Sequence, residues 1–304
     1  MDKFDKAIEI FKIGSQISQK NYKKPIVVTY SGGKDSDAVL EVAKASGELF
    51  EVHNSHTTCD APETVRHIAK KFRELEIQGI KCVKEMPKYK GENVSMWSLI
   101  PQKLLPPTRR VRYCCQILKE TGCANRMIAT GVRWEESSKR KQRETFETIA
   151  ARREDSIKVS SEIMLMNDND QKRKLIEHCQ LKSKSCCNPI ISFTTNDVWE
   201  LLEEQKVEVN PLYQMGYDRV GCIGCPMATK AKRKKEFADF PKYKDLYIQA
   251  FDRMLEVRKK RNIPTRFSSG ANVFLWWMED DNIQGQLSFD YENEEISNNL
   301  IDTY

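Results

Sequence analysis

A short apolar run that leads into a glycine turn constrains the fold of this chain more than any other feature. Residues 26–29, Ile-Val-Val-Thr, are mostly β-branched and predict a buried parallel strand. The turn that follows reads Ser31-Gly32-Gly33-Lys34-Asp35-Ser36. Residues 37–43 then have the spacing of a helix. A strand, a glycine turn and a helix in this order direct free backbone N–H groups at an anion.

Further apolar runs alternate with helical stretches along the chain. We expect strands at residues 49–53, 80–84, 127–130 and 188–191. We expect helices at residues 3–20, 62–78, 112–121, 197–205 and 230–260, the last split at Pro241. This alternation predicts an α/β fold with a doubly wound, mostly parallel sheet and a C-terminal helical region. In such a sheet the ligand lies at the carboxyl ends of the strands.

The charge of the chain is unevenly distributed. The 304 residues carry a formal net charge of +6. Residues 279–304 hold eight Asp and Glu and no Lys or Arg, which leaves 50 basic and 36 acidic residues, a net +14, on residues 1–278. A positive charge of this size on residues 1–278 favours the binding of polyanions such as nucleotides, tRNA or DNA. The basic stretches 230–235 and 258–261 could contact nucleic-acid phosphates, and the alternative is a solvated helical face.

Composition also indicates a compartment. At 39% hydrophobic and 31% charged residues, the chain is typical of a soluble globular protein. No apolar run approaches the roughly 20 residues that span a bilayer, and the polar first residues do not resemble a signal peptide. We therefore expect a cytoplasmic protein with no membrane partner. In that compartment ten cysteines indicate metal or redox chemistry rather than disulfides.

The glycine turn differs from the common loop G-x-x-x-x-G-K-[ST], because its glycines are adjacent and Asp35 follows the lysine. It resembles the PP-loop of the adenine nucleotide α-hydrolase superfamily. Members of that superfamily cleave ATP between the α- and β-phosphates, or hold an adenylyl-sulfate. The resemblance implies an adenine nucleotide α-hydrolase-like fold, with ATP or adenylyl-sulfate as substrate and Mg²⁺ as cofactor. The alternative is a tight turn with incidental glycines.

Cysteines form the second signal. A tandem pair, Cys114-Cys115, is followed far downstream by Cys222-x-x-Cys225. Four thiolates can hold zinc or an iron–sulfur cluster, and buried unligated thiols are the alternative. The arrangement resembles the cluster-bearing branch of the adenylyl-sulfate and phosphoadenylyl-sulfate reductase family. The resemblance implies that these four cysteines ligate a [4Fe-4S] cluster and that Lys119 lies near it.

The stretch from Gly131 to Arg140 resembles a G-x-R-x-x-E-S-x-x-R motif of the same family. The implied nucleotide-binding residues are Tyr30, Ser31, Gly32, Gly33, Lys34, Asp35, Ser36, Glu63, Gly131, Glu136 and Ser137. The implied catalytic residues are Lys34, Asp35, Arg133, Arg140 and Lys119, with Asp35 a candidate Mg²⁺ ligand through water. The two arginines suit bidentate contacts to oxyanions. The alternative interpretation is that they are solvated charges on the surface.

One departure from the family decides between reactions. Reductases of the family carry a cysteine nucleophile in a C-terminal tail, whereas no cysteine follows Cys225 here. The pattern is similar to the branch that includes the sulfur-insertion subunit of DNA phosphorothioation systems. That branch implies an ATP pyrophosphatase that transfers sulfur, with DNA or tRNA as candidate acceptor and a cysteine desulfurase or reductant protein as candidate partner. Adenylyl-sulfate or phosphoadenylyl-sulfate reduction is the alternative, and a non-catalytic nucleic-acid-binding module with a structural cluster is the second.

The remaining expectations concern domains and other cysteines. We expect a nucleotide-binding domain at residues 1–229, with a possible insertion at 141–188 that includes strands near 156–166, and a basic helical region with an acidic tail at 230–304. Cys59 is a candidate sulfur-carrying thiol, and the pair Cys186-Cys187 is a candidate to ligate the cluster in place of Cys114-Cys115 or to carry sulfur. Cys82 and Cys123 are expected in the core.

Overall fold

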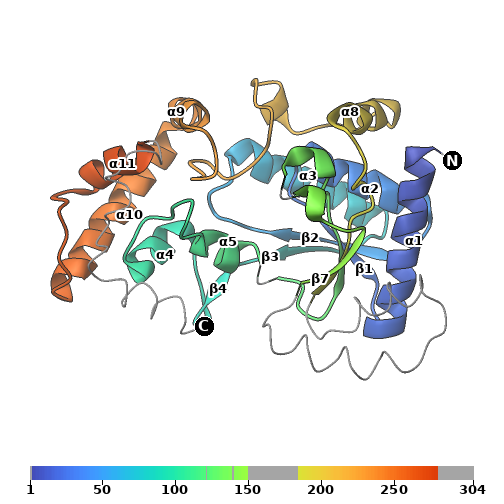
Figure 1. Ribbon diagram of the computed structural model, residues 1–304, viewed down its shortest axis with the longest axis horizontal. Coiled ribbons are helices and arrows are strands. Elements are labelled where there is room, and N and C mark those ends of the chain that lie inside the picture. Colours follow the sequence, from blue (N-terminus) through green and yellow to red (C-terminus); the bar gives the residue numbers. More distant parts are fainter. Residues whose placement is uncertain (1, 121, 139, 150–183, 280–304) are drawn as a thin grey trace. The chain divides into compact units, whose positions relative to one another are not determined.

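The computed structural model describes residues 2–120, 122–138, 140–149 and 184–279 (Figure 1). They form two compact units, each assembled from several stretches of chain. The sheet unit comprises Met1–Ser55, Pro62–Glu85 and Gly122–Val220. The helical unit comprises His56–Ala61, Met86–Thr121 and Gly221–Tyr304. The predicted boundary at residue 229 stays a prediction, and the strands expected near 156–166 lie outside the described residues.

A six-stranded sheet of order β3-β2-β1-β6-β8-β7 forms the centre of the sheet unit. The strands are β1 (Ile26–Thr29), β2 (Phe50–Ser55), β3 (Cys82–Glu85), β6 (Met127–Ala129), β7 (Phe146–Ile149) and β8 (Lys184–Cys187). All neighbours pair in parallel except β7, which runs antiparallel to β8. The predicted mostly parallel α/β fold is confirmed.

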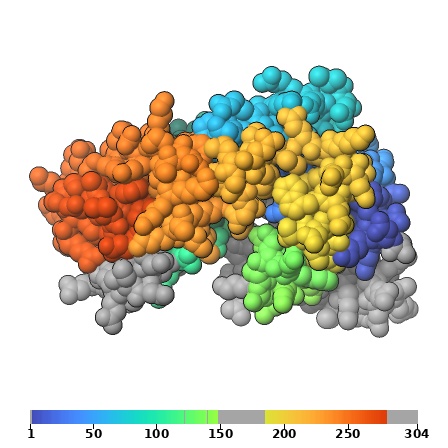
Figure 2. Space-filling view, turned by 90° about the horizontal axis from the view of Figure 1, so that it is seen from above, coloured from blue at the N-terminus to red at the C-terminus, as the bar shows by residue number. Residues whose placement is uncertain are grey.

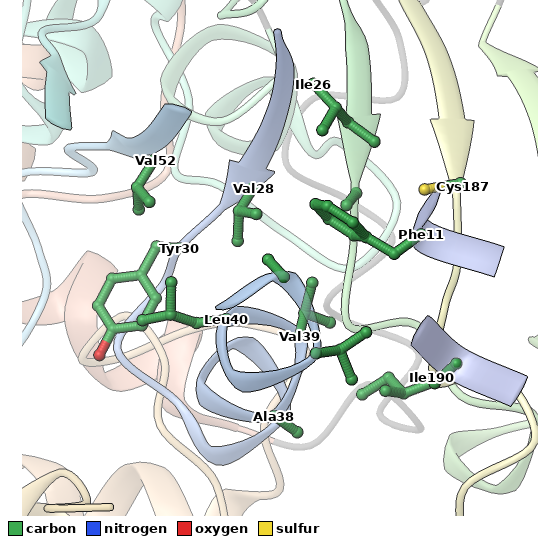
Figure 3. Packing of buried hydrophobic residues seen from close by; sticks show 14 of the residues in the cluster. Phe11, Ile26, Val28, Tyr30, Ala38, Val39, Leu40, Val52, Cys187 and Ile190 are labelled. Carbon is green, nitrogen blue, oxygen red and sulfur yellow. The ribbon is translucent and has the colours of Figure 1, made fainter. Parts of the chain in front are cut away.

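Helices cover one face of this sheet. They are α1 (Lys3–Tyr22), α2 (Lys34–Ser46), α3 (Pro62–Ile77) and α8 (Thr195–Glu204), with the 3-10 turns η1 (Trp134–Glu136), η2 (Arg140–Gln142) and η3 (Pro211–Tyr213). Side chains alternate along a strand, so Ile26 and Val28 of β1 face the helices and meet Phe11 and Leu40 (Figure 3). In Figure 2 the yellow segment that contains α8 lies against the blue N-terminal residues, where Lys3 donates to Asp197.

The opposite face of the sheet is different in character. Its apolar part is a small cluster of Val27, Ile128 and Cys186, with Cys123 packed against it. Toward β2 and β3 the same face carries Glu51 and His53, which are both buried. Cys123, which was expected in the core, packs against this cluster, and its sulfur also lies 3.5 Å from Nδ1 of His53.

The helical unit contains the hairpin β4–β5 (Lys88–Tyr89 and Glu92–Asn93) and the helices α4 (Met96–Lys103), α5 (Tyr113–Leu118), α9 (Lys230–Asp239), α10 (Pro241–Lys260) and α11 (Gly270–Met278). Its core is aromatic. The Tyr247 ring centroid lies 4.9 Å from that of Trp97 and 4.7 Å from that of Trp277. The predicted split at Pro241 is confirmed, because a proline at the first position of a helix starts α10.

Two local predictions are wrong. The last parallel strand is Lys184–Cys187 rather than residues 188–191, because Asn188 begins a turn in which its carbonyl accepts from the N–H of Ile191. The helix predicted at 112–121 is the shorter α5. None of the helices described here is long and apolar enough to cross a membrane.

Candidate nucleotide site and cysteine cluster

The chain changes direction across the sheet between β1 and β6. From β1 it winds outward through β2 to β3, and from β6 it continues on the other side to β8. The carboxyl ends of β1 and β6 therefore lie at a topological switch point, where α/β proteins bind ligands. The PP-loop follows β1, and Gly131 follows β6. A Cβ on Gly131 would lie 2.8 Å from the carbonyl oxygen of Asp35, so only glycine permits this approach of the two loops.

The PP-loop is a left-handed turn that leads into α2. Gly32 has φ +74°, and a Cβ there would also meet Ile68 of α3 at 2.9 Å. Gly33 is the N-cap residue of α2, and the Ser36 hydroxyl donates back to its carbonyl at 2.7 Å. The positive end of the α2 dipole is thus placed at the switch point.

A tyrosine from η3 reaches this loop. The Lys34 backbone N–H donates to the Tyr213 hydroxyl at 2.8 Å, across 179 residues of sequence. Asn210 fixes the segment, because its side-chain amide donates to the Gly32 carbonyl at 2.9 Å and to the Thr64 hydroxyl at 3.1 Å. No local signal in the sequence indicates that Tyr213 lies on the PP-loop.

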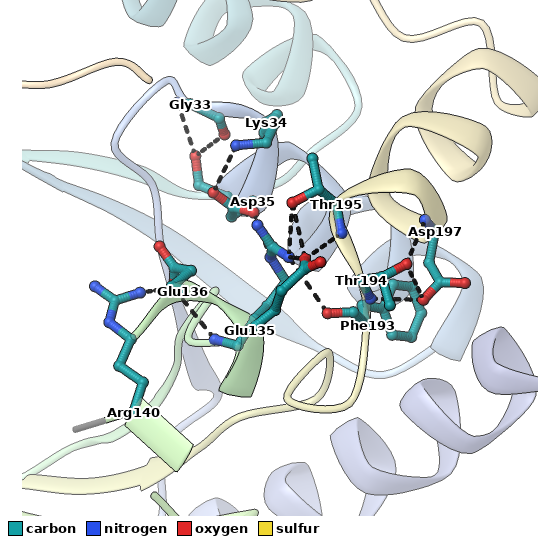
Figure 4. Close-up of polar contacts among 12 residues, drawn as sticks. Gly33, Lys34, Asp35, Glu135, Glu136, Arg140, Phe193, Thr194, Thr195 and Asp197 are labelled. Atoms are coloured by element: carbon teal, nitrogen blue, oxygen red, sulfur yellow. Dashed lines mark hydrogen bonds and ion pairs between the residues drawn. The ribbon is translucent and has the colours of Figure 1, made fainter. Parts of the chain in front are cut away.

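Arg133 and Asp35, both predicted to be catalytic, contact each other. The Arg133 Nε donates to Asp35 at 2.7 Å, and its Nη1 donates to Glu135 at 2.9 Å. Glu135 also accepts a hydrogen bond from the backbone N–H of Thr195 at 2.5 Å (Figure 4). Only 2% of the Arg133 side chain is exposed. This arginine is therefore placed to hold Asp35 rather than to reach a substrate.

Arg140 is the more accessible arginine, with 31% of its side chain exposed. It forms an ion pair with Glu136, whose other contact is with the backbone N–H of Arg133 (Figure 4). Burial lowers the pKa of Arg140, and the positive charge of Arg219 lowers it further. Two cations that destabilise each other in this way indicate a site suited to an anion.

The other predicted nucleotide-binding residues are distributed around this region. Lys34 is largely buried, and its ammonium lies 3.5 Å from Asp35. Ser31 and Ser36 share a hydroxyl contact of 3.4 Å, and Ser137 caps the Arg140 N–H. Three residues contribute less directly, because Tyr30 points its ring into the core, Glu63 pairs with Arg66 in the first turn of α3, and Gly131 acts through its small size.

The four predicted ligand cysteines all belong to the helical unit. Cys114 and Cys115 lie in α5, and Cys115 accepts from Arg112 at 3.3 Å. The loop from Cys222 to Cys225 is held by the core, since Tyr247 donates to the Ile223 carbonyl at 3.0 Å and the Gly224 N–H donates to Glu236 at 2.8 Å. Arg109 joins the two segments, because its Nε donates to the Pro226 carbonyl at 3.0 Å.

A fifth cysteine joins this cluster. Cys59 is fully buried, its carbonyl accepts from the Ile223 N–H at 2.8 Å, and the neighbouring Asp60 forms a β-bridge with Cys222. The hydrogen bond from the Cys59 thiol lowers the pKa of Cys222 to about 7. This bridge lies directly before α3, which begins at Pro62.

The surroundings favour the thiolate form at Cys115 and Cys222, whereas the hydrogen bond with Cys115 raises the pKa of Cys114 and burial raises that of Cys225. A hydrogen bond from Cys114, assisted by Arg112, lowers the pKa of Cys115 to about 5. The negative charge that Cys222 carries as a thiolate raises the pKa of Lys119, as the charge of Cys225 also does. Thiolates are the form in which cysteine binds metal.

The donor set fits a cluster better than a single ion. Tetrahedral zinc with Zn–S bonds of about 2.3 Å holds its sulfurs roughly 3.8 Å apart. Across the described part of the chain, no three of these sulfurs lie within 4.8 Å of one another. Four thiols on two segments, with sulfurs spaced more widely than a single zinc ion requires, suit a group with several metal atoms.

Comparison with known families shows to which protein family the chain belongs. A model described as the phosphoadenosine phosphosulfate reductase domain matches residues 25–228, about two-thirds of the chain. The chain belongs to this family. The match contains the PP-loop, the Gly131–Arg140 stretch and all four predicted ligand cysteines.

This family member has two relatives in Methanocaldococcus jannaschii, both uncharacterized proteins. They are 26% and 24% identical to the present chain. The matches cover 72% and 79% of this chain but 40% and 49% of the relatives, so the chain spans less than half of their length.

Two solved structures illustrate the range of similar folds. The phosphoadenylyl-sulfate reductase from Candida auris, as a phosphate complex, is 14% identical with a TM-score of 0.43, over 71% of this chain and 87% of that one. The U34-tRNA thiolase NcsA from Methanococcus maripaludis, with its [4Fe-4S] cluster, is 11% identical with a TM-score of 0.38, over 86% and 83%. Values this low do not distinguish between reactions.

Proposed function

We propose that this family member is a sulfurtransferase of the ATP pyrophosphatase type. An acceptor oxygen attacks the α-phosphate of ATP, the bond to the β-phosphate breaks, and pyrophosphate leaves. Hydrosulfide then attacks the adenylated carbon, and AMP leaves with the former acceptor oxygen. Neither step oxidises or reduces the acceptor, so the balance requires only ATP and a donor of sulfide.

One observation carries the proposal: a chain with a PP-loop at a switch point also gathers two distant cysteine segments in a second unit. Arg109 and Arg112 contact these segments directly, at the Pro226 carbonyl and at the Cys115 sulfur. A nucleotide site alone would fit many adenylyl-transferring enzymes. A thiolate cluster in the same chain favours sulfur as the group that is transferred.

Different residues of the sheet unit bind the phosphates, the Mg²⁺ ion and the leaving pyrophosphate of ATP. The N-terminus of α2 and the Lys34 ammonium bind phosphate, and Arg140 neutralises the charge that develops on the leaving pyrophosphate. Asp35 binds Mg²⁺ through water, and Arg133 is the positioning residue that orients it by the 2.7 Å contact. Tyr213, whose pKa burial raises above its usual range, stays protonated and can donate to a phosphate oxygen.

Residues of the helical unit hold the sulfur-handling group. Cys114, Cys115, Cys222 and Cys225 would ligate a [4Fe-4S] cluster, and inorganic sulfide could be held at an iron from which one of the four thiolates has dissociated. Lys119 places a positive charge beside the thiolates. Cys59, in contact with Cys222, is the thiol best placed to substitute for a ligand or to accept sulfur.

A nucleic acid is the acceptor class that we favour, because α9 and α10 expose the lysines 234, 235, 242, 244, 259 and 260. Two arginines of the predicted basic stretches do not belong to this surface. Arg233 is buried and donates to the Trp277 carbonyl at 2.9 Å, and Arg258 is buried and donates to the Leu104 carbonyl at 2.9 Å. A cysteine desulfurase would supply sulfur as a persulfide, and a reductant protein would provide the two electrons that release it as sulfide.

Reduction of adenylyl-sulfate or phosphoadenylyl-sulfate is the second candidate, and the family match favours it. In that reaction a thiolate attacks the sulfonate and sulfite is released after reduction. A nucleic-acid-binding module with a structural cluster is the third, and it predicts no nucleotide turnover at all.

Product analysis separates these functions. We expect the anaerobic holoprotein to release pyrophosphate from ATP and Mg²⁺, and to release no sulfite from either sulfated nucleotide with reduced thioredoxin. The assay measures both products in parallel, with nucleic acid added to half of the samples. Multiple turnovers of sulfite would replace the proposal by the reductase, and a lack of both products would support the binding module.

Iron content tests the cluster independently of turnover. Protein purified without oxygen should be brown and contain about four iron atoms per chain. The double variant Cys222→Ser/Cys225→Ser should lose this iron, while Cys82→Ser, on β3 of the sheet unit, should keep it. One zinc atom per chain with no iron would contradict the cluster assignment.

A further inference from the structure

Three donor groups of different chemistry meet on the face of the sheet opposite to α1, α2, α3 and α8. His53 lies on β2, Glu85 ends β3, and Cys123 lies in the loop before β6. Their ligand atoms, the His53 Nδ1, a Glu85 carboxylate oxygen and the Cys123 sulfur, lie within 4.8 Å of one another. This group belongs to the sheet unit, whereas the predicted cluster cysteines belong to the helical unit.

The separations match the edges of a coordination tetrahedron. Zinc with bonds of about 2.0–2.1 Å to nitrogen and oxygen and about 2.3 Å to sulfur separates its ligand atoms by roughly 3.3–3.6 Å. The nitrogen and the oxygen are 3.0 Å apart, and each lies 3.5 Å from the sulfur. An ion can therefore replace the protons that now join these atoms with little movement of the backbone.

The surroundings of the histidine are those of a metal ligand. The other ring nitrogen of His53, Nε2, lies 3.1 Å from Glu51. Glu51 is held in turn by Arg126 at 2.9 Å and by Lys81 at 3.2 Å. A carboxylate that accepts from the second nitrogen fixes the tautomer of a ligating histidine, so that Nδ1 presents its lone pair to the ion. Ser55 lies 3.5 Å from the second oxygen of Glu85 and supports that ligand.

The three ligand residues differ in solvent exposure, which determines from which side an ion can reach them. His53 is buried at 8% exposure, whereas Glu85 and Cys123 are half-buried. An ion could thus enter from the side of the carboxylate and the thiol. Three protein ligands leave a fourth coordination position for water.

We propose that His53, Glu85 and Cys123 bind a divalent transition-metal ion, with zinc the best match to the mixed N, O and S donor set. On binding, the proton between Nδ1 and the Glu85 carboxylate and the thiol proton leave to water, Nε2 keeps its proton toward Glu51, and three metal–ligand bonds form. The ion ties the loop at residue 123 to β2 and β3. This site is separate from the cysteine cluster and does not rest on the proposed function.

Cobalt is a suitable probe, because Co²⁺ takes the place of zinc and its bond to a thiolate absorbs light. We expect the chelator-treated holoprotein, with its iron intact, to bind one Co²⁺ per chain with a thiolate-to-cobalt band. Cys123→Ser should lose the band, and Glu51→Gln, which leaves all three ligands in place, should weaken binding by about 10–100-fold. The matched control is Cys82→Ser, which removes the neighbouring thiol of β3 and should leave both unchanged.

Two outcomes would overturn the proposal. A band that survives in Cys123→Ser but disappears in Cys222→Ser/Cys225→Ser would place cobalt in the cysteine cluster. Absence of saturable Co²⁺ or Zn²⁺ binding by the folded wild-type protein would show that hydrogen bonds alone hold the three residues together. Circular dichroism of each variant identifies any that fail to fold, and the wild-type titration stands without them.

Discussion

Lys34→Ala should reduce nucleotide turnover by about 100-fold or more, the loss typical of removing one preorganised charge from a reacting phosphate. The ammonium lies 3.5 Å from Asp35 and at the N-terminus of α2, where the phosphates of ATP are expected. Folding should suffer much less, because Asp35 keeps its partner Arg133 when the lysine is removed. The measurement is the rate of pyrophosphate release, with thermal unfolding recorded for the same preparation.

Lys44→Ala is the matched control for this variant. Lys44 lies in the last turn of the same helix and pairs with Glu41 at 2.8 Å, so its removal changes the charge of α2 equally. We expect its turnover to stay close to that of the wild type. Equal turnover in a folded Lys34→Ala protein would remove the PP-loop from the catalytic site.

Asp37→Asn should stabilise the protein above neutral pH. Asp37 is fully buried in α2, it accepts from the Tyr30 hydroxyl at 2.7 Å, and its second oxygen has no partner among the described residues. Burial raises the pKa of this carboxyl from 3.8 to about 7. The native state therefore retains a proton that the unfolded chain has already released, so stability falls as the pH rises from about 4 to about 7.

The shift corresponds to a cost of about 4 kcal/mol at pH 8, which asparagine does not incur because it cannot ionise. In urea unfolding, we compare the free energy of unfolding of Asp37→Asn with that of the wild type. The difference in favour of the variant should grow by this order of magnitude between pH 4 and pH 8. Asp5→Asn, at an exposed position of α1, is the control and should track the wild type. Parallel pH profiles for wild type and Asp37→Asn would show that the carboxyl is not protonated in the native state.

Local sequence was sufficient to predict the structure where the functional residues and the secondary-structure signals lie in one stretch of chain. Residues 26–36 predicted the strand, the turn and the start of α2, because β-branched residues and adjacent glycines act within a few positions. The strand expected at 188–191 was misplaced for a tertiary reason. The N–H of Asn188 donates to the Thr145 carbonyl and its side chain to the Glu144 carbonyl, so the ladder ends at Cys187.

Contacts across long separations could not be predicted in this way. Nothing near Tyr213 indicates that its hydroxyl accepts from the PP-loop, and nothing near Cys59 indicates that it adjoins Cys222. A single histidine such as His53 is uninformative in a sequence. Its significance comes from Glu85 and Cys123, 32 and 70 positions away, which the fold of the sheet brings to it.

The interleaved composition of the two units has a consequence for biosynthesis. The chain passes between them after residues 55, 61, 85, 121 and 220. While the ribosome has released only the first hundred residues, β1 can pair with β2, but its other edge waits for Met127–Ala129 of β6. That edge, Ile26-Val27-Val28-Thr29, is apolar and unprotected during this interval, which makes it a template for wrong pairing between nascent chains. Slower translation before residue 127 or a lack of chaperones should therefore lower the yield of native protein.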